Sequence, residues 1–117
     1  MKEQIKERTK QLAVRVARLC FQLPKNVAAY AYSNQVVRSS SSVGANYRAA
    51  CLAKSSKDFI NKLKIVEEEA DETIYFLELI DEIFDTNSQE VKMLINEYKE
   101  ILAIIISSIK TARKNHL

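Results

Sequence analysis

In the second half of this sequence an apolar or small residue recurs every three or four positions, and this spacing restricts the fold more than any other feature. The first run comprises Phe59, Leu63, Val66, Ala70, Thr73, Leu77, Ile80 and Phe84. The second run comprises Val91, Leu94, Tyr98, Ile101, Ile105, Ser108 and Ala112. Heptad spacing of this kind lines one side of an α-helix that packs against another helix. Two long helices are therefore predicted, over about residues 56–85 and from residue 87 or 88 onward.

The first half of the sequence predicts two more helices. An apolar stripe runs through residues 3–22, and Pro24 then ends that helix because proline cannot continue it. A second helical pattern covers about residues 25–52 and carries Gly44 in its interior, where a kink is expected. A serine at position 55 or 56 is suited to cap the third helix.

Turn-forming residues are scarce, since the 117 residues include one glycine and one proline. Strands joined by tight turns need such residues, so their scarcity argues against a β-sheet protein. Four helices with connections of a few residues must run antiparallel to their sequential neighbours. The predicted fold is all-α, an up-down-up-down antiparallel four-helix bundle that forms a single domain over residues 1–117.

The last two predicted helices carry a second apolar stripe beside the first. Its members are Ile74, Phe76, Leu79, Ile83, Ile95, Leu102, Ile106 and Ile109. A monomeric bundle needs one apolar face on each helix, and contiguous apolar surface beyond that face usually marks an interface. We therefore expect a homo-oligomer.

Neither end of the sequence predicts a targeting or membrane segment. The opening residues lack the apolar stretch of a signal peptide, and the densest apolar run, Ile101 to Ile106, is far shorter than the roughly 18 to 20 residues of a membrane span. We expect a soluble, cytoplasmic protein. We also expect Cys20 and Cys51 to be reduced thiols that pack between helices.

Catalytic and metal-binding constellations are incomplete. Carboxylates are dense between Glu67 and Glu72, but di-iron bundles also use a Glu-x-x-His motif on each of two helices, and the one histidine is His116. The four serines at positions 39–42 have no histidine in the same motif to act as a base. We therefore expect no enzymatic activity, no catalytic residues, no metal and no cofactor.

Charge is distributed unevenly along the chain. Residues 1–64 hold 13 Lys or Arg against three acids, a net charge of +10, whereas residues 65–117 hold five against twelve, a net charge of −7. This asymmetry fits nucleic-acid binding by the first half, head-to-tail assembly of subunits, or neutralisation within the bundle.

Basic residues interleaved with tyrosines favour the first of these uses, binding of structured RNA or DNA through phosphate contacts. The candidate contacts are Lys6, Lys10, Arg15, Arg18, Arg38 and Arg48. The alternative is a protein-only scaffold or adaptor, whose basic and acidic halves serve ring assembly and partner binding.

A stripe of small polar residues marks the second predicted helix. Gln35, Ser39, Ser42 and Asn46 share one face, because they are spaced by four, three and four positions. A phosphate-binding loop would need several glycines at a helix N-terminus, which this stretch lacks. Close packing of the helix, with the polar groups satisfied by buried hydrogen bonds, is the favoured interpretation.

Four short motifs carry a family resemblance. They are Phe21-Gln-Leu-Pro24, Gln35-Val-Val-Arg38, Ser42-Val-Gly-Ala-Asn46 and Ser55-Ser-Lys-Asp-Phe59. Over about residues 15–85 the chain resembles the four-helix-bundle family named for the 23S ribosomal RNA intervening sequence. It departs from the family pattern at Gly44, where proline is usual, and at residues 47–50, where Ile-Ala-Glu-Gly is usual.

The resemblance implies a small bacterial bundle that assembles as a ring-like homopentamer. It also implies a relation to accessory proteins of diversity-generating retroelements, which bind nucleic acid and a reverse transcriptase. No catalytic residues come with it. The matching positions Gln35, Arg38, Ser42 and Asn46 are implied to fix helix packing.

Overall fold

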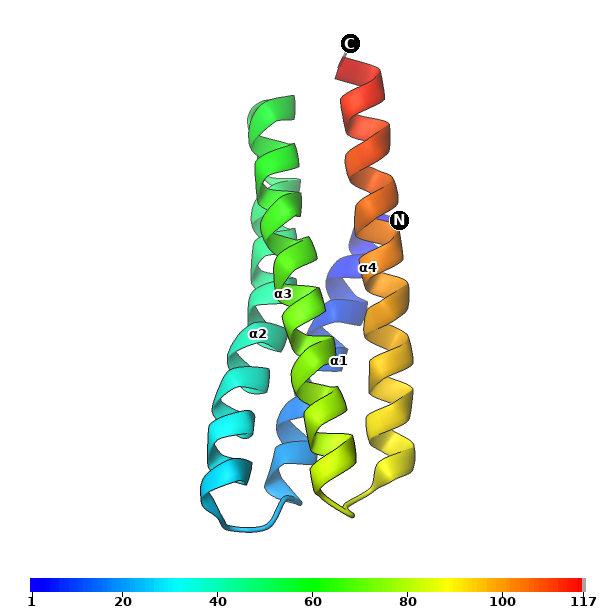
Figure 1. Cartoon of the computed structure of the whole chain (residues 1–117). Helices are drawn as coiled ribbons and strands as arrows, with labels where there is room; N and C mark the ends of the chain where they lie inside the picture. Colours follow the sequence, from blue (N-terminus) through cyan, green and yellow to red (C-terminus); the bar gives the residue numbers. More distant parts are fainter. Residues whose placement is uncertain (117) are drawn as a thin grey trace.

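The computed structural model describes residues 1–116 as four helices, with no strand in that range. They are α1 (Lys2–Phe21), α2 (Val27–Cys51), α3 (Ser56–Ile83) and α4 (Ser88–His116). Successive helices run in opposite directions (Figure 1). The predicted all-α class and antiparallel four-helix bundle are confirmed. No helix in the described range has the length of apolar sequence that crossing a membrane requires.

Two of the helix starts are held by side-chain caps, and the cap at Ser55 is one that the sequence predicts. Asn26 accepts a hydrogen bond from the backbone N–H of Ala29 (2.9 Å), and Ser55 accepts one from the N–H of Asp58 (3.0 Å). These bonds satisfy backbone donors that the first turn of a helix leaves without a partner. Before α4, Asn87 has a positive φ of 47°, a conformation that asparagine tolerates better than most residues.

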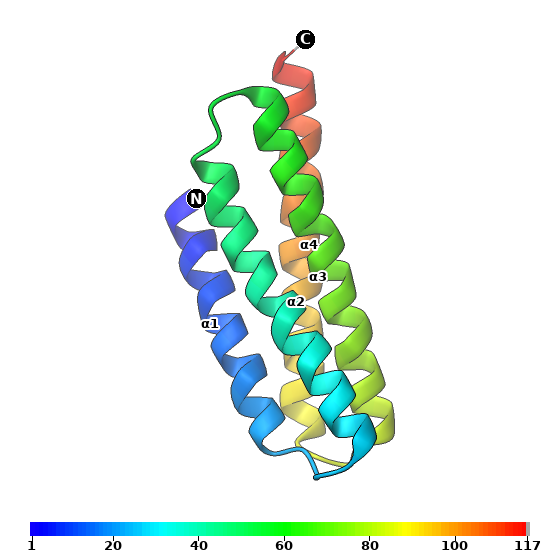
Figure 2. The same cartoon turned by 90° about the vertical axis from the view of Figure 1, so that its left-hand side faces the viewer.

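The helices differ in length, and this shapes the two ends of the molecule. α3 packs extensively on both α2 and α4, whereas α1 contacts α4 least. The bundle measures 50 × 20 × 20 Å. At one end α3 and α4 extend past the start of α1, so the C-terminal turns of α4 stand beyond the N-terminus (Figures 1 and 2).

Most residues of the two heptad runs lie in the core. Phe59, Ser108 and Ala112 are partly buried, and all the others are buried. The second apolar stripes are covered in part by the chain itself, since Ile74, Ile95 and Ile109 are also buried. A helix in a square bundle touches two neighbours, and this widens the apolar face that one subunit needs. The width of these faces therefore supports an oligomer less strongly than the sequence suggested.

Gly44 provides space between α1 and α2. α2 continues as a helix through this position, and a Cβ atom at Gly44 would lie 3.2 Å from the Oγ1 atom of Thr9. Thr9 is itself buried, and its hydroxyl donates to the backbone oxygen of Ile5 (2.8 Å). The glycine therefore allows the two helices to approach closely at this level.

The polar stripe of α2 divides into buried and exposed members. The Thr73 hydroxyl of α3 donates to Ser39 Oγ (2.9 Å), and both residues are buried. Asn46 is half-buried and donates from Nδ2 to the backbone oxygen of Ser42 (2.9 Å) within the same helix. Gln35 is exposed, and its side chain forms no hydrogen bond with another described residue, contrary to the expectation of a buried hydrogen bond. Among the residues that the structure describes, Ser39 is thus the one member of the stripe whose side chain forms a hydrogen bond to another helix.

We expect Gly44→Leu to lower the free energy of unfolding by about 1 to 3 kcal/mol, because the added side chain overlaps Thr9 and forces α1 away from α2. Chemical denaturation followed by circular dichroism measures this change. Ala45→Leu is the matched control, since Ala45 is exposed and its substitution should change stability by less than about 0.5 kcal/mol. Equal stabilities of the two variants would contradict the close approach.

We expect Thr73→Val to lower the free energy of unfolding by about 1 kcal/mol, because it removes the hydroxyl that bonds to Ser39 while keeping the shape of the side chain. Combined with Ser39→Ala, the decrease should be smaller than the sum of the two single decreases, since both variants break the same bond. Additive decreases in this double-mutant cycle would show that the bond contributes nothing. Thr111→Val, at an exposed position of α4, controls for the substitution itself.

Candidate nucleic-acid interface

Three arginines of the basic half are paired with carboxylates of the acidic half in the same chain. Arg15 of α1 binds Glu90 of α4 through two bonds, from Nη2 (2.8 Å) and from Nε (3.1 Å). Arg8, also on α1, bonds to Glu97 and to Glu100 of α4. A paired, planar guanidinium of this kind fixes geometry as well as charge. These contacts connect α1 to α4, which are the neighbouring helices that pack least on each other.

Arg38 makes the corresponding connection between α2 and α3. Its Nη1 atom donates to Glu69 (2.9 Å) and its Nη2 atom donates to Glu72. The hydrogen bond to Glu69 is the main cause that raises the pKa of Arg38, as the bond to Glu90 does for Arg15. Part of the charge asymmetry is therefore neutralised inside the bundle, which was one of the three uses left open by the sequence.

Arg38 is exposed despite its bonds to α3, and the other four candidate bases face solvent to different extents. Lys6 pairs with Glu3 on the surface of α1 (3.0 Å). Lys10, Arg18 and Arg48 are exposed, and none of them forms an ion pair with a residue among those that the structure describes. Charges in this state remain available to an external anion.

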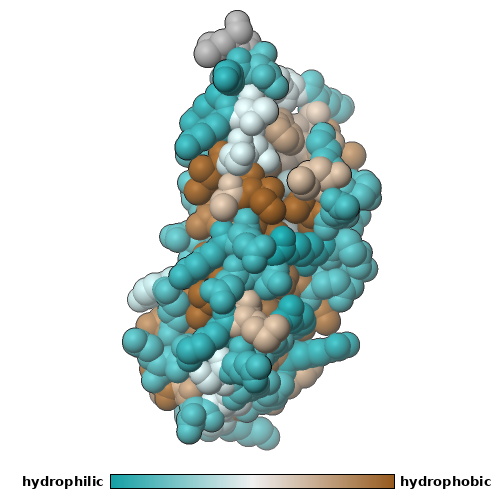
Figure 3. All heavy atoms as spheres, turned by 90° about the vertical axis from the view of Figure 1, so that its right-hand side faces the viewer, coloured by the Kyte–Doolittle hydropathy of each residue, from teal (hydrophilic) through white to brown (hydrophobic). Residues whose placement is uncertain are grey.

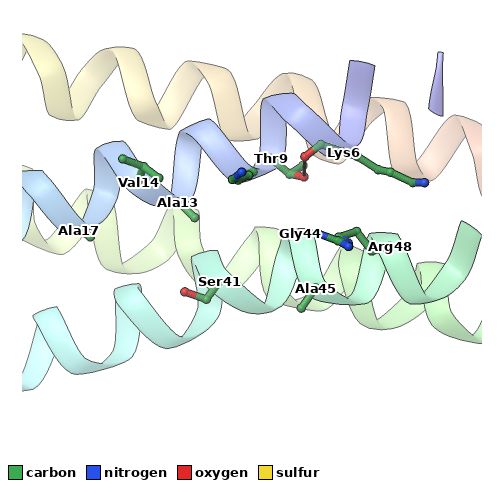
Figure 4. Close-up of a pocket in the computed structure, with 10 residues that line it drawn as sticks. Lys6, Thr9, Ala13, Val14, Ala17, Ser41, Gly44, Ala45 and Arg48 are labelled. Atoms are coloured by element: carbon green, nitrogen blue, oxygen red, sulfur yellow. Dashed lines mark hydrogen bonds between the residues drawn. The ribbon is translucent and has the colours of Figure 1, made fainter. Parts of the chain in front are cut away.

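A groove of about 590 Å³ between α1 and α2 brings three of these bases together (Figure 4). Lys6 and Lys10 line it from α1, and Arg48 lines it from α2. The residues that line the middle of the groove have small side chains. They include Ala13, Ala17, Ser41, Gly44 and Ala45. We call this feature the α1–α2 groove.

Two carboxylates reduce the net positive charge at the basic end of the groove. Glu3 and Glu7 lie beside Lys6, Lys10 and Arg48 around a smaller hollow of about 250 Å³. Glu3 pairs with Lys6, and Glu7 accepts a hydrogen bond from Gln11 (2.9 Å). Lys10 and Arg48 are therefore the bases of this group with the least internal compensation.

The described part of the chain offers little other chemistry. No three His, Cys, Asp or Glu residues within it gather in a way that could hold a metal ion. Cys20 and Cys51 are free and half-buried. Burial raises the pKa of the Cys20 thiol and raises the pKa of Tyr47 to about 12. Both groups are therefore neutral near pH 7 and poor nucleophiles.

Sequence reasoning missed the small-residue floor of the groove and the Arg8 contacts. Ala13 and Ala17 are four positions apart on α1, as are Ser41 and Ala45 on α2, and this repeated spacing of small residues was the signal for close helix approach. Which carboxylates would pair with Arg8 could not be read from the sequence, because Glu97 and Glu100 are about ninety positions away.

Comparison with known proteins agrees with the fold and with the motifs. A crystal structure of a protein of unknown function from the S23 ribosomal protein family of Bacteroides thetaiotaomicron is 38% identical in sequence. The similarity covers 94% of this chain and 99% of that chain, with a TM-score of 0.84. No match is found among curated proteins.

The model of one protein family, described as 23S rRNA-intervening sequence protein, matches residues 1–107. This range includes α1, α2, α3 and most of α4, and it contains all four of the short motifs. The chain therefore belongs to the 23S rRNA-intervening sequence protein family.

Proposed function

We propose that this protein is a non-enzymatic, cytoplasmic nucleic-acid-binding protein whose contact surface is the α1–α2 groove. The observation that carries the proposal is the convergence of Lys6, Lys10 and Arg48 on that groove. Lys10 and Arg48 are exposed, and they have no carboxylate partner among the described residues. Exposed cations on one surface bind phosphates and release counterions, and this supports sequence-tolerant binding.

The proposed surface is smaller than the set of six bases that the sequence suggested. Arg15 and Arg38 connect helices through Glu90, Glu69 and Glu72, so we assign them to holding the bundle together. Moving the half-buried Arg15 guanidinium onto a phosphate would leave the half-buried Glu90 carboxylate unpaired, at a cost in stability. Arg38 is exposed, but its two carboxylates offset the charge that it would offer to a phosphate. Arg18 is exposed on α1 but does not line the α1–α2 groove, so it also lies outside the proposed surface.

We also propose that the chain forms a homo-oligomer, for which the family resemblance suggests a pentamer. Repetition of a weak basic surface in every subunit would raise its avidity for a long polymer. Apolar surface supports this proposal: Figure 3 shows hydrophobic residues below the C-terminus, on the face that includes α4. In this part of α4, Leu102, Ile104 and Ile106 are half-buried.

A protein-only scaffold is the second candidate, and one surface of α3 favours it. Ile65, Tyr75 and Ile83 are large apolar residues that are exposed there. Glu68 and Glu78 are exposed on the same helix. An acidic and apolar helix of this kind is complementary to a basic groove with a small-residue floor, either of a partner or of the next subunit.

We expect the double substitution Lys10→Ala and Arg48→Ala to weaken binding of RNA and DNA alike, because each removes a cation that binds phosphate whatever the base sequence. The slope of log K against log salt should fall by about one unit for each phosphate that is no longer bound. Mobility shift and fluorescence anisotropy across salt concentrations measure this. Lys99→Ala with Lys110→Ala removes the same charge from exposed positions of α4 and is the matched control. An absence of binding at low salt to either polymer would favour the scaffold.

We expect sedimentation equilibrium to give a mass that is a multiple of 13.4 kDa at micromolar concentration. Ile104→Lys should reduce that mass if the half-buried surface of α4 forms the contact, since an ammonium group opposes burial. Lys110→Ala should leave it unchanged. A single species at the mass of one chain, at all concentrations tested, would refute self-association.

A further inference from the structure

The α1–α2 groove continues past Ala17 toward the connection between the two helices, where its lining changes from basic to aromatic. Ala17 lines both the basic part and a second hollow of about 490 Å³. Phe21 and Tyr30 line this second hollow from α1 and α2, with Val37 beside them. The two hollows are therefore successive parts of one groove along the outer side of α1 and α2.

The two aromatic rings at this end take no part in the core. Phe21 is 83% exposed and Tyr30 is 57% exposed, although a phenylalanine side chain is normally buried on folding. Their backbones are well held, since Phe21 is the last residue of α1 and Tyr30 lies in the first turn of α2. Between them Leu23 is buried and Asn26 caps α2. The rings are thus presented to solvent from a rigid support.

We infer that the α1–α2 groove binds single-stranded nucleic acid, with phosphates at Lys10 and Arg48 and bases stacked on Phe21 and Tyr30. The inference rests on the function proposed above, and it specifies that the bound nucleic acid is single-stranded. Positively charged grooves with exposed aromatic rings are the common design for binding single strands without sequence preference. Lys10 and Phe21 are about 17 Å apart along α1 at 1.5 Å per residue, so one short strand can reach both ends.

A duplex cannot use the aromatic end in the same way. Its bases are already stacked on one another, so their flat faces are closed to Phe21 and Tyr30. The local charges also favour a ligand that gains from stacking. Glu3 and Glu7 lie beside the lysines, and Arg38 at the aromatic end is bound to Glu69 and Glu72. Phosphate contacts alone would therefore be few.

Tyr30→Trp provides a direct test, because the chain has no tryptophan and the variant would carry one at the aromatic end. Adding a short oligothymidine or oligouridine to the full chain should quench its fluorescence, since a stacked base lies against the indole ring. Tyr75→Trp is the matched control: Tyr75 is 55% exposed on α3, outside the groove, and its signal should stay unchanged. Equal responses of the two variants would overturn the inference.

Affinity measurements form the second arm of the test. Phe21→Ala and Tyr30→Ala should each weaken binding of the single-stranded oligonucleotide roughly fivefold or more, the equivalent of about 1 kcal/mol. Binding of a duplex of the same length should not change. Tyr75→Ala should leave both affinities unchanged. Circular dichroism should show that the variants remain folded, because both rings lie outside the core.

The outcomes separate this inference from the function on which it rests. If the aromatic substitutions have no effect, or weaken duplex and single strand equally, the single-strand inference is wrong and phosphate binding by Lys10 and Arg48 stands. If the unmodified protein binds neither form at low salt, the proposed function itself fails. Fluorescence of Tyr30→Trp that changes with protein concentration, and not with oligonucleotide, would assign the groove to a second copy of the chain and overturn the inference.

Discussion

Burial of the α3 seam between α2 and α4 is the constraint on which the rest of the structure depends. Leu63, Val66, Leu77 and Ile80 are fully buried along this helix, and α3 is the helix that packs extensively on two neighbours. Removing apolar surface from water is the main favourable term in folding, and these positions remove most of theirs. The hydrogen bond between Thr73 and Ser39 lies among these buried residues, where it fixes the position of α2 along the axis of α3.

α1 is held in a different way, and this determines which surface remains open. Its apolar stripe packs inward, while Arg8 and Arg15 reach sideways to carboxylates of α4. On the other side Gly44 lets α2 approach Thr9 closely. The outward face of the α1 and α2 pair is left with small side chains along its centre, and it becomes a groove that no helix within residues 1–116 covers. The candidate site is thus a consequence of how α1 is attached to the bundle.

Pairing within the chain changes the meaning of the charge asymmetry. A net charge of +10 over residues 1–64 suggests a broad basic surface, but three of its arginines are bound to carboxylates of α3 or α4. Bidentate and bridging guanidinium contacts of this kind stabilise the arrangement of helices, and they reduce the field that an external phosphate experiences. What remains is a narrower cationic site at one end of a groove, with aromatic rings at the other end.

The sequence by itself determined the helices, their order and most of the core, because heptad spacing and capping residues are local signals. Residues 56–85 and Ser55 illustrate this, since both were recognisable without any distant contact. It also carried the family motifs. Only the tertiary structure decided which bases remain free, because Arg15 and Glu90 meet across 75 positions of sequence. Only the tertiary structure decided the groove as well, because its walls come from two antiparallel helices. Lys10 and Arg48 lie across the groove from each other at a separation that depends on how closely Gly44 lets those helices pack.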